Sequence, residues 1–239
     1  MKQIHKTQER IVFETDMNIE LANAVRRSSN EVPILAIEEV DIYKNDSALY
    51  DEVVANRLGL VPLKNQKLKK DDVLEFKLKA KAPNEGIKEV MSGEMGDNVV
   101  YGEMPIVFLA NGQELELVAK AKNNIGKEHA RHSPGLIYYK HLPEIKISGE
   151  GENQTELADL YPGVFKLNDK GKLDVKDAWK CDFDNEDMKE MGYKGIEISI
   201  NDKLVMVIES WGQIKPEEIF TEACKALKAN LSDVEKALK

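Results

Sequence analysis

Cysteine is scarce in this sequence, which has 239 residues and only two cysteines, Cys181 and Cys224. Two cysteines far apart along the chain exclude a disulfide scaffold, a four-thiolate zinc site and an iron–sulfur cluster held by thiolates alone. The sequence also lacks the glycine-rich loops that hold phosphates in P-loop and dinucleotide-binding proteins. The low cysteine content suits a reducing compartment.

Long hydrophobic runs are missing as well. No stretch approaches the roughly 20 apolar residues of a membrane-spanning helix, and the first ten residues lack the apolar run of a signal peptide. We therefore expect a cytoplasmic protein with no membrane contact. The formal net charge of −9 disfavours a free-standing nucleic-acid binder. With 42% hydrophobic and 32% charged residues, the composition is that of a globular chain.

The N-terminal pattern predicts a strand, a helix and a second strand. The first strand covers residues 9–14, and Asp16 or Asn18 caps a helix that runs to about Ser29. Pro33 ends this region, because the residue before a proline avoids helical backbone angles. A strand over residues 34–42 follows.

The middle of the chain is predicted to be rich in β-structure. Residues 73–80, 114–118 and 143–148 alternate apolar and polar side chains, as half-buried strands do. Residues 149–155 are polar and glycine-rich, which indicates a boundary loop. Asn201 and Asp202 are expected to form the turn of a hairpin between strands at 195–200 and 203–209.

The C-terminal region predicts a long amphipathic helix that begins at Pro216, with Glu217 and Glu218 beside its positive end. Apolar residues recur along it at steps of three and four. Two interpretations remain open from this pattern alone, since the apolar stripe fits packing within the chain as well as an interface with another chain.

Four blocks of sequence, in order along the chain, carry a resemblance to a known family. They are Leu21-Ala-Asn-Ala-Val-Arg-Arg27 with Glu31-Val-Pro-Ile-Leu-Ala-Ile37, then residues 47–63, residues 126–134 and residues 209–218. Together they resemble the alpha-like subunits of RNA polymerase, and the blocks are most similar to those of the archaeal members of that family.

The resemblance implies an α+β fold and a role in assembly. It implies a discontinuous dimerisation domain at 1–43 and 201–239, an inserted β-rich domain at 44–155, and a ferredoxin-like subdomain at 156–200. In this family the chain pairs with a smaller subunit, L. With the small subunits N and P, the pair forms the platform for the large catalytic subunits. The resemblance further implies that the complex is a nucleotidyltransferase and that this chain carries no catalytic residue.

The resemblance also implies two sets of contact residues. The motif in the first block places Asn23, Arg26 and Arg27 toward a large subunit, with Arg57 and Leu58 as weaker candidates, although a solvated helix end and a structural loop are the alternatives. Contacts with subunit L are expected from an apolar set on the two helices: Leu21, Val25, Phe220, Ala223, Leu227, Leu231 and Val234.

The third block contains His129 and His132. Two histidines could ligate a metal, but no third ligand is apparent nearby. We therefore expect these histidines, with Lys127 and Arg131, to make polar contacts with neighbouring subunits or to decorate a loop.

Residues 161–200 resemble the ferredoxin-like insertion found in some archaeal members of the family. Cluster-binding versions use the spacing Cys-x2-Cys-x2-Cys-x3-Cys. Counted from Cys181, these positions hold Cys181, Asp184, Asp187 and Met191, and Tyr161-Pro162 stands where a Cys-Pro is expected. The sequence therefore predicts a lobe that keeps its fold through apolar packing and binds no cluster, no other metal and no cofactor.

Two other functions remain alternatives at this level. The ferredoxin-like segment would suit an iron–sulfur redox protein, although the missing thiolates count against it. The acidic composition would suit a protein–protein adaptor outside transcription.

Overall fold

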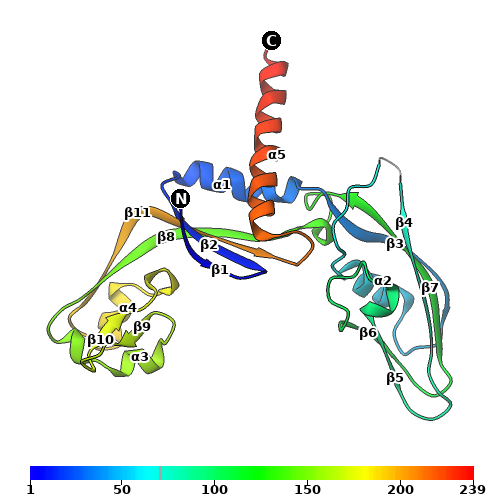
Figure 1. Cartoon of the computed structure of the whole chain (residues 1–239), viewed down its shortest axis with the longest axis horizontal. Coiled ribbons are helices and arrows are strands. Elements are labelled where there is room, and N and C mark those ends of the chain that lie inside the picture. Colours follow the sequence, from blue (N-terminus) through cyan, green and yellow to red (C-terminus); the bar gives the residue numbers. More distant parts are fainter. Residues whose placement is uncertain (70–71) are drawn as a thin grey trace. The chain divides into compact units, whose positions relative to one another are not determined.

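The computed structural model describes residues 1–69 and 72–239, and its elements are labelled in Figure 1. The described chain divides into two compact units. Unit 1 consists of Met1–His5, Val12–Ala22 and Tyr138–Val207. Unit 2 consists of Lys6–Ile11, Asn23–Ile137 and Ile208–Lys239. Among the described residues, no helix is long and apolar enough to cross a membrane.

A four-stranded sheet contributes most of the β-structure of unit 1. Its order is β1-β2-β11-β8, from the strands β1 (Lys2–Lys6), β2 (Arg10–Thr15), β8 (Gly135–Ile147) and β11 (Ile196–Ser210). The expected strand at 9–14 is confirmed as β2, while β1 was not predicted. Burial of Val12, Val205 and Val207 beside Trp179 forms the core of this sheet.

The predicted hairpin at Asn201 and Asp202 is wrong, because β11 is one continuous strand of 15 residues. Asn-Asp lacks the glycine that favours a tight two-residue turn. The strand also has neighbours on both sides in the sheet. The Asn201 carbonyl lies 3.1 Å from Nδ1 of His141 on β8, and Lys203 pairs with Glu14 on β2. These contacts hold the segment extended.

A small α+β lobe lies within unit 1. It contains α3 (Glu156–Leu160), β9 (Phe165–Leu167), β10 (Leu173–Val175) and α4 (Asn185–Glu190), and β9 pairs antiparallel with β10. The expected apolar packing is present: Val164, Phe165 and Ile196 belong to the core of this lobe. Trp179 packs in the sheet core.

Replacement of Phe165 tests this core. We expect Phe165→Ala to lower the free energy of unfolding by about 3–5 kcal/mol, because a buried aromatic ring is lost and a cavity remains. Leu167, on the same strand but 49% exposed, provides the control, and Leu167→Ala should cost less than about 1 kcal/mol. Urea titration followed by circular dichroism measures both, and equal losses would contradict the assignment of the core.

The core of unit 2 lies under a three-stranded antiparallel sheet of order β3-β7-β4. The strands are β3 (Ile34–Asn45), β4 (Leu74–Lys81) and β7 (Glu114–Asn124). The predicted alternation is confirmed on β4, where Phe76, Leu78 and Ala80 are buried while the residues between them are exposed. The unpredicted α2 (Asp51–Gly59) packs into the same core, and β5 (Lys88–Met91) pairs with β6 (Pro105–Leu109).

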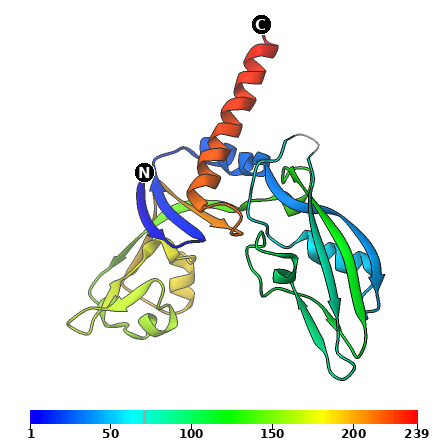
Figure 2. The same ribbon diagram turned by 45° about the vertical axis from the view of Figure 1, so that its right-hand side comes forward.

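The expected dimerisation residues lie on two helices. The first begins in unit 1 and ends in unit 2, and the second lies wholly in unit 2. α1 (Ile19–Ser28) begins after Asn18, whose Oδ1 accepts a hydrogen bond from the amide of Leu21 at 2.9 Å. α5 (Pro216–Ala237) starts with proline in its first turn, as predicted. Figures 1 and 2 both show the C-terminal part of α5 running beyond the other elements of unit 2.

The compact units do not follow the expected domain boundaries. β3 begins in the segment expected to belong to 1–43, yet it pairs with β7. β8 falls in the segment expected to belong to 44–155, yet it shares a sheet with β11. The three-part division into functional domains therefore stays a prediction.

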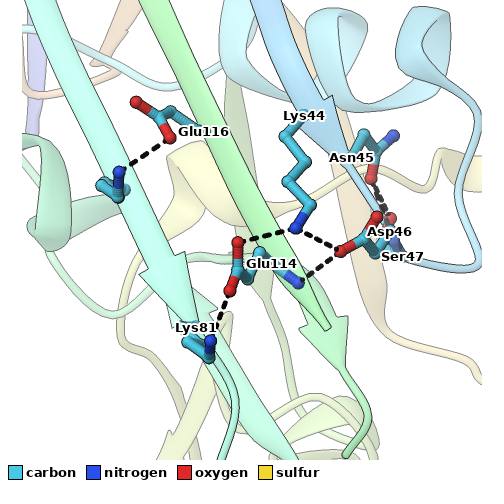
Figure 3. A network of polar contacts seen from close by, with 8 residues as sticks. Lys44, Asn45, Asp46, Ser47, Lys81, Glu114 and Glu116 are labelled. Carbon is cyan, nitrogen blue, oxygen red and sulfur yellow. Dashed lines mark hydrogen bonds and ion pairs between the residues drawn. The ribbon is translucent and has the colours of Figure 1, made fainter. Parts of the chain in front are cut away.

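One carboxylate links all three strands of the unit 2 sheet (Figure 3). Glu114 on β7 accepts from Nζ of Lys44 on β3 at 2.7 Å and from Nζ of Lys81 on β4 at 2.5 Å. Its amide donates to Oδ2 of Asp46 at 3.1 Å. The two lysines hold the pKa of Glu114 down, from 4.5 to about 2.

This network predicts a pH dependence of stability. Because the pKa of Glu114 is lower in the folded chain, its contribution is complete above about pH 4.5 and is lost as the pH falls toward 2. We expect Glu114→Gln to flatten the loss of stability across that window, as measured by thermal unfolding from pH 7 to pH 2. Glu89→Gln, on β5 outside the network, serves as control and should keep the original slope.

Candidate interaction surfaces

The first candidate surface lies on α1. Oδ1 of Asn23 accepts from Nε and Nη2 of Arg26, at 3.1 and 2.9 Å. This bidentate contact fixes the guanidinium on the helix surface in one orientation. Arg27 is exposed, and its side chain has no hydrogen bond or ion pair within residues 1–69 and 72–239. A fixed and a free guanidinium side by side suit a carboxylate-bearing partner.

The two weaker candidates on α2 behave differently from each other. Arg57 is exposed, and its Nη1 donates to the carbonyl of Ile106 on β6 at 2.7 Å. Leu58 is fully buried in the core of unit 2. The expectation of a partner contact through Leu58 is therefore wrong, because its side chain reaches no surface.

The third block is anchored to β3 rather than decorating a loop. Nη1 of Arg131 donates to the carbonyls of Ile37 and Glu38, at 2.9 and 3.3 Å. Gly59 lets the guanidinium approach, since a Cβ there would stand 3.1 Å from Nη1 of Arg131. Arg131 therefore makes contacts within unit 2, an outcome that neither expectation for this block, contact with neighbouring subunits or decoration of a loop, had included.

His132 has a structural environment. Its ring is buried, and Nδ1 lies 2.9 Å from the carbonyl of Ile34, which requires a proton on Nδ1. Burial lowers the pKa of His132, which favours the neutral form of the ring. Within the described part of the chain, no group of three or more histidine, cysteine or acidic residues is arranged to hold a metal ion.

We expect Arg131→Ala to destabilise unit 2 by about 1.5–3 kcal/mol, because two β3 carbonyls lose a charged donor. Lys127→Ala, in the same block but at an exposed position, should change stability by less than about 0.5 kcal/mol. Chemical denaturation of the two variants gives the comparison. Equal stability of both variants would show that the hydrogen bonds from Arg131 to the β3 carbonyls do not contribute to the free energy of unfolding.

The four positions of the degenerate cluster motif serve local structure. Cys181 is buried and its thiol donates to the carbonyl of Phe183 at 3.2 Å, while burial raises the thiol pKa. Asp184 caps α4 by accepting from the amide of Asp187 at 3.1 Å, and Asp187 accepts from the amide of Asp184 at 2.8 Å. Both carboxylates thus accept hydrogen bonds from backbone amides at the N-terminus of α4.

Aromatic side chains fill the neighbourhood of these positions. The hydroxyl of Tyr161 donates to Sδ of Met191 at 3.4 Å. The ring of Phe183 lies between Tyr161 and Phe165, with centroid distances of 4.8 and 6.1 Å. One protonated thiol, two capping carboxylates and a thioether bonded to tyrosine do not fit the ligand set of an iron–sulfur cluster.

The expected dimerisation residues fall into two groups. Val25 and Ala223 are buried, and Phe220 and Leu227 are half-buried against the same cluster of unit 2. The second group is exposed and consists of Leu21 (45%), Leu231 (62%) and Val234 (58%). Direct contact through Val25 and Ala223 is therefore corrected to internal packing, while the exposed group remains available to a partner.

A sequence profile described as the RNA polymerase Rpb3/Rpb11 dimerisation domain matches residues 12–231. The chain belongs to this family.

Relatives support the same assignment along almost the whole chain. The chain is 34% identical to a protein named DNA-directed RNA polymerase subunit Rpo3 from Pyrococcus horikoshii, over 95% of this chain and 93% of the relative. It is 33% identical to the Rpo3 subunit of Methanobrevibacter smithii, over 93% of this chain and 92% of the relative. A subunit of RNA polymerases I and III from Dictyostelium discoideum is 28% identical, over 95% of this chain and 78% of the relative.

Family membership confirms the assignment to the polymerase subunits and the α+β fold expected from the sequence. It supports an assembly role for this chain and leaves catalysis to the polymerase as a whole. The redox and adaptor alternatives find no support among these relatives.

Sequence reasoning missed the turn at Trp211 to Gln213 as a candidate surface. Trp211 falls within the fourth block but was assigned no role, although a tryptophan followed by glycine stands out in a chain with two tryptophans. The structure leaves Trp211 44% exposed while it buries Trp179. Exposed tryptophan is enriched at protein interfaces.

Proposed function

We propose that this chain is an assembly subunit of an archaeal DNA-directed RNA polymerase and acts in the cytoplasm by pairing with the small alpha-like subunit L. The observation that carries the proposal is the half-covered apolar stripe of α5. Leu227 packs inside unit 2, while Leu231 and Val234, further along the same helix, stay exposed. A pair of helices from subunit L would cover these two side chains and bury the rest of the apolar stripe of α5.

The wider assembly follows from the arginine surface of α1. Asn23 holds Arg26 in one orientation, and Arg27 is free to pair with a carboxylate on a large subunit. Small subunits N and P would complete the platform. No step of RNA synthesis is assigned to this chain, and no direct contact with specific nucleic-acid sequences is proposed, in keeping with its net charge of −9.

Replacement of Leu231 tests the pairing surface. Leu231→Glu should lower the recovery of co-expressed subunit L by more than about tenfold, because a carboxylate would be buried in an apolar seam. The variant should fold normally, since Leu231 is 62% exposed in the chain alone. Affinity purification of the tagged chain measures recovery, and circular dichroism verifies the fold.

Lys225→Glu is the matched control, because it adds the same carboxylate at an exposed position of α5 that is already polar. It should leave recovery of subunit L unchanged. Undiminished pairing of Leu231→Glu would remove the end of α5 from the interface. Failure of the unaltered chain to bind subunit L at all would refute the proposed function.

A further inference from the structure

One asparagine of the sequence is followed directly by glycine, and this pair lies in the turn between β6 and β7. The two residues are Asn111 and Gly112, and both are exposed. Gly112 has a φ of +72°, which a residue without a Cβ adopts readily. The amide of Gln113 donates to the carbonyl of Ala110 at 2.9 Å and closes the turn. The pair is therefore accessible to water while its backbone is held in one conformation.

An Asn-Gly pair can deamidate without an enzyme. The backbone nitrogen of Gly112 gives its proton to solvent and attacks Cγ of Asn111. A nitrogen–carbon bond forms, and the side-chain nitrogen takes a proton from solvent and leaves as ammonia. Water then opens the cyclic imide at either carbonyl and yields aspartate or isoaspartate. Since glycine has no Cβ, its side does not shield the attacking nitrogen.

Both reacting groups are held by the segment that joins β4 to β5. Oδ1 of Asn111 accepts from the amide of Gly86 at 2.8 Å, which fixes the side-chain amide in one orientation. The amide of Gly112 donates to the carbonyl of Pro83 at 3.0 Å. This bond must open before the nitrogen can lose its proton, as in amide hydrogen exchange. Residues 83–86 therefore form a clamp on the nucleophile and on the carbonyl that it attacks.

The clamp continues the strand pairing of unit 2. The last pair between β4 and β7 joins Lys81 to Glu114. The amide of Ala82 then donates to the carbonyl of Gln113 at 2.9 Å, and Pro83 follows directly. The contacts with Asn111 thus depend on the pairing of β4 with β7 as well as on the turn itself.

We infer that Asn111 is a deamidation site whose reaction is suppressed in the folded chain by residues 83–86. When the clamp opens, the reaction adds a negative charge at position 111, and isoaspartate also adds one atom to the main chain. That atom falls between Ala110 and Gln113, next to the Glu114 network of Figure 3. The inference concerns the chemistry of this chain alone and is independent of the proposed function.

An internal comparison tests the suppression. Lys170→Asn places a second Asn-Gly pair in the turn between β9 and β10, where Gly171 has the same φ of +72°. The Gly171 amide also donates to a carbonyl, that of Asn168, at 2.9 Å. Within residues 1–69 and 72–239, the side chain at position 170 has no hydrogen bond or ion pair. This turn therefore lacks the side-chain contact of the clamp.

The full-length variant is incubated in mildly alkaline buffer, and deamidation at each position is measured by peptide mapping with mass spectrometry. In the folded chain, position 170 should react about fivefold faster than Asn111 or more, the order expected for one additional hydrogen bond. In concentrated urea the two positions should react at similar rates. Equal rates in the folded chain would overturn the inference.

Matched glycine variants test the clamp directly. Gly86 and Gly96 both have a φ of +111°, so alanine introduces the same backbone strain at either position of unit 2. The amide of Gly86 donates to Asn111, whereas that of Gly96 donates to the carbonyl of Gly93. Gly86→Ala should raise the deamidation rate at Asn111 about fivefold or more, and Gly96→Ala should leave it unchanged. Circular dichroism verifies that both variants fold. No change in Gly86→Ala, or an equal rise in Gly96→Ala, would refute the clamp.

Discussion

The apolar stripe of α5 is covered within this chain only along its first part, and Leu231 and Val234 further along stay exposed. Ala223 is enclosed by Val25, Val32 and Ile34, and Leu227 lies at the edge of the same cluster. Further along the helix Nδ2 of Asn230 still donates to Oε2 of Glu31 at 2.6 Å, and Figure 2 shows the C-terminal part of α5 extending beyond the other elements of unit 2. The internal contacts hold the base of α5, and under the proposed function its exposed end is already ordered before it meets a partner. A helix stabilised in this way loses little conformational entropy when it pairs.

The strand β3 ties the rest of unit 2 to this helix. Its first residue, Ile34, packs under α5, and the Ile34 carbonyl receives the buried ring of His132. Three residues later the carbonyl of Ile37 receives Arg131. Blocks that are about 100 residues apart are thereby fixed to one strand. The turn at Trp211 and α5 consequently belong to one packed unit.

Local patterns in the sequence predicted which segments form helices and strands better than they predicted where those segments begin and end. Alternation identified β4, and spacing of apolar residues identified α1 and α5, because these signals depend on which face is buried. The hairpin at Asn201 failed because strand neighbours on both sides decide whether a turn forms, and those neighbours are remote in sequence. For the same reason the family motifs did not separate Leu58, which is buried, from Arg57, which is exposed.

The small α+β lobe of unit 1 gives each of the four positions of the predicted cluster spacing a structural contact of its own. A cluster would bind through thiolates and bring four points of the chain together. Here Asp184 and Asp187 tie the start of α4 by reciprocal capping, and Met191 at its end is bonded to Tyr161. The ring of Phe183 occupies the space between Tyr161 and Phe165. Each of these positions thus contributes a contact of its own, and the lobe is stabilised by packing that is independent of iron and of oxidation state.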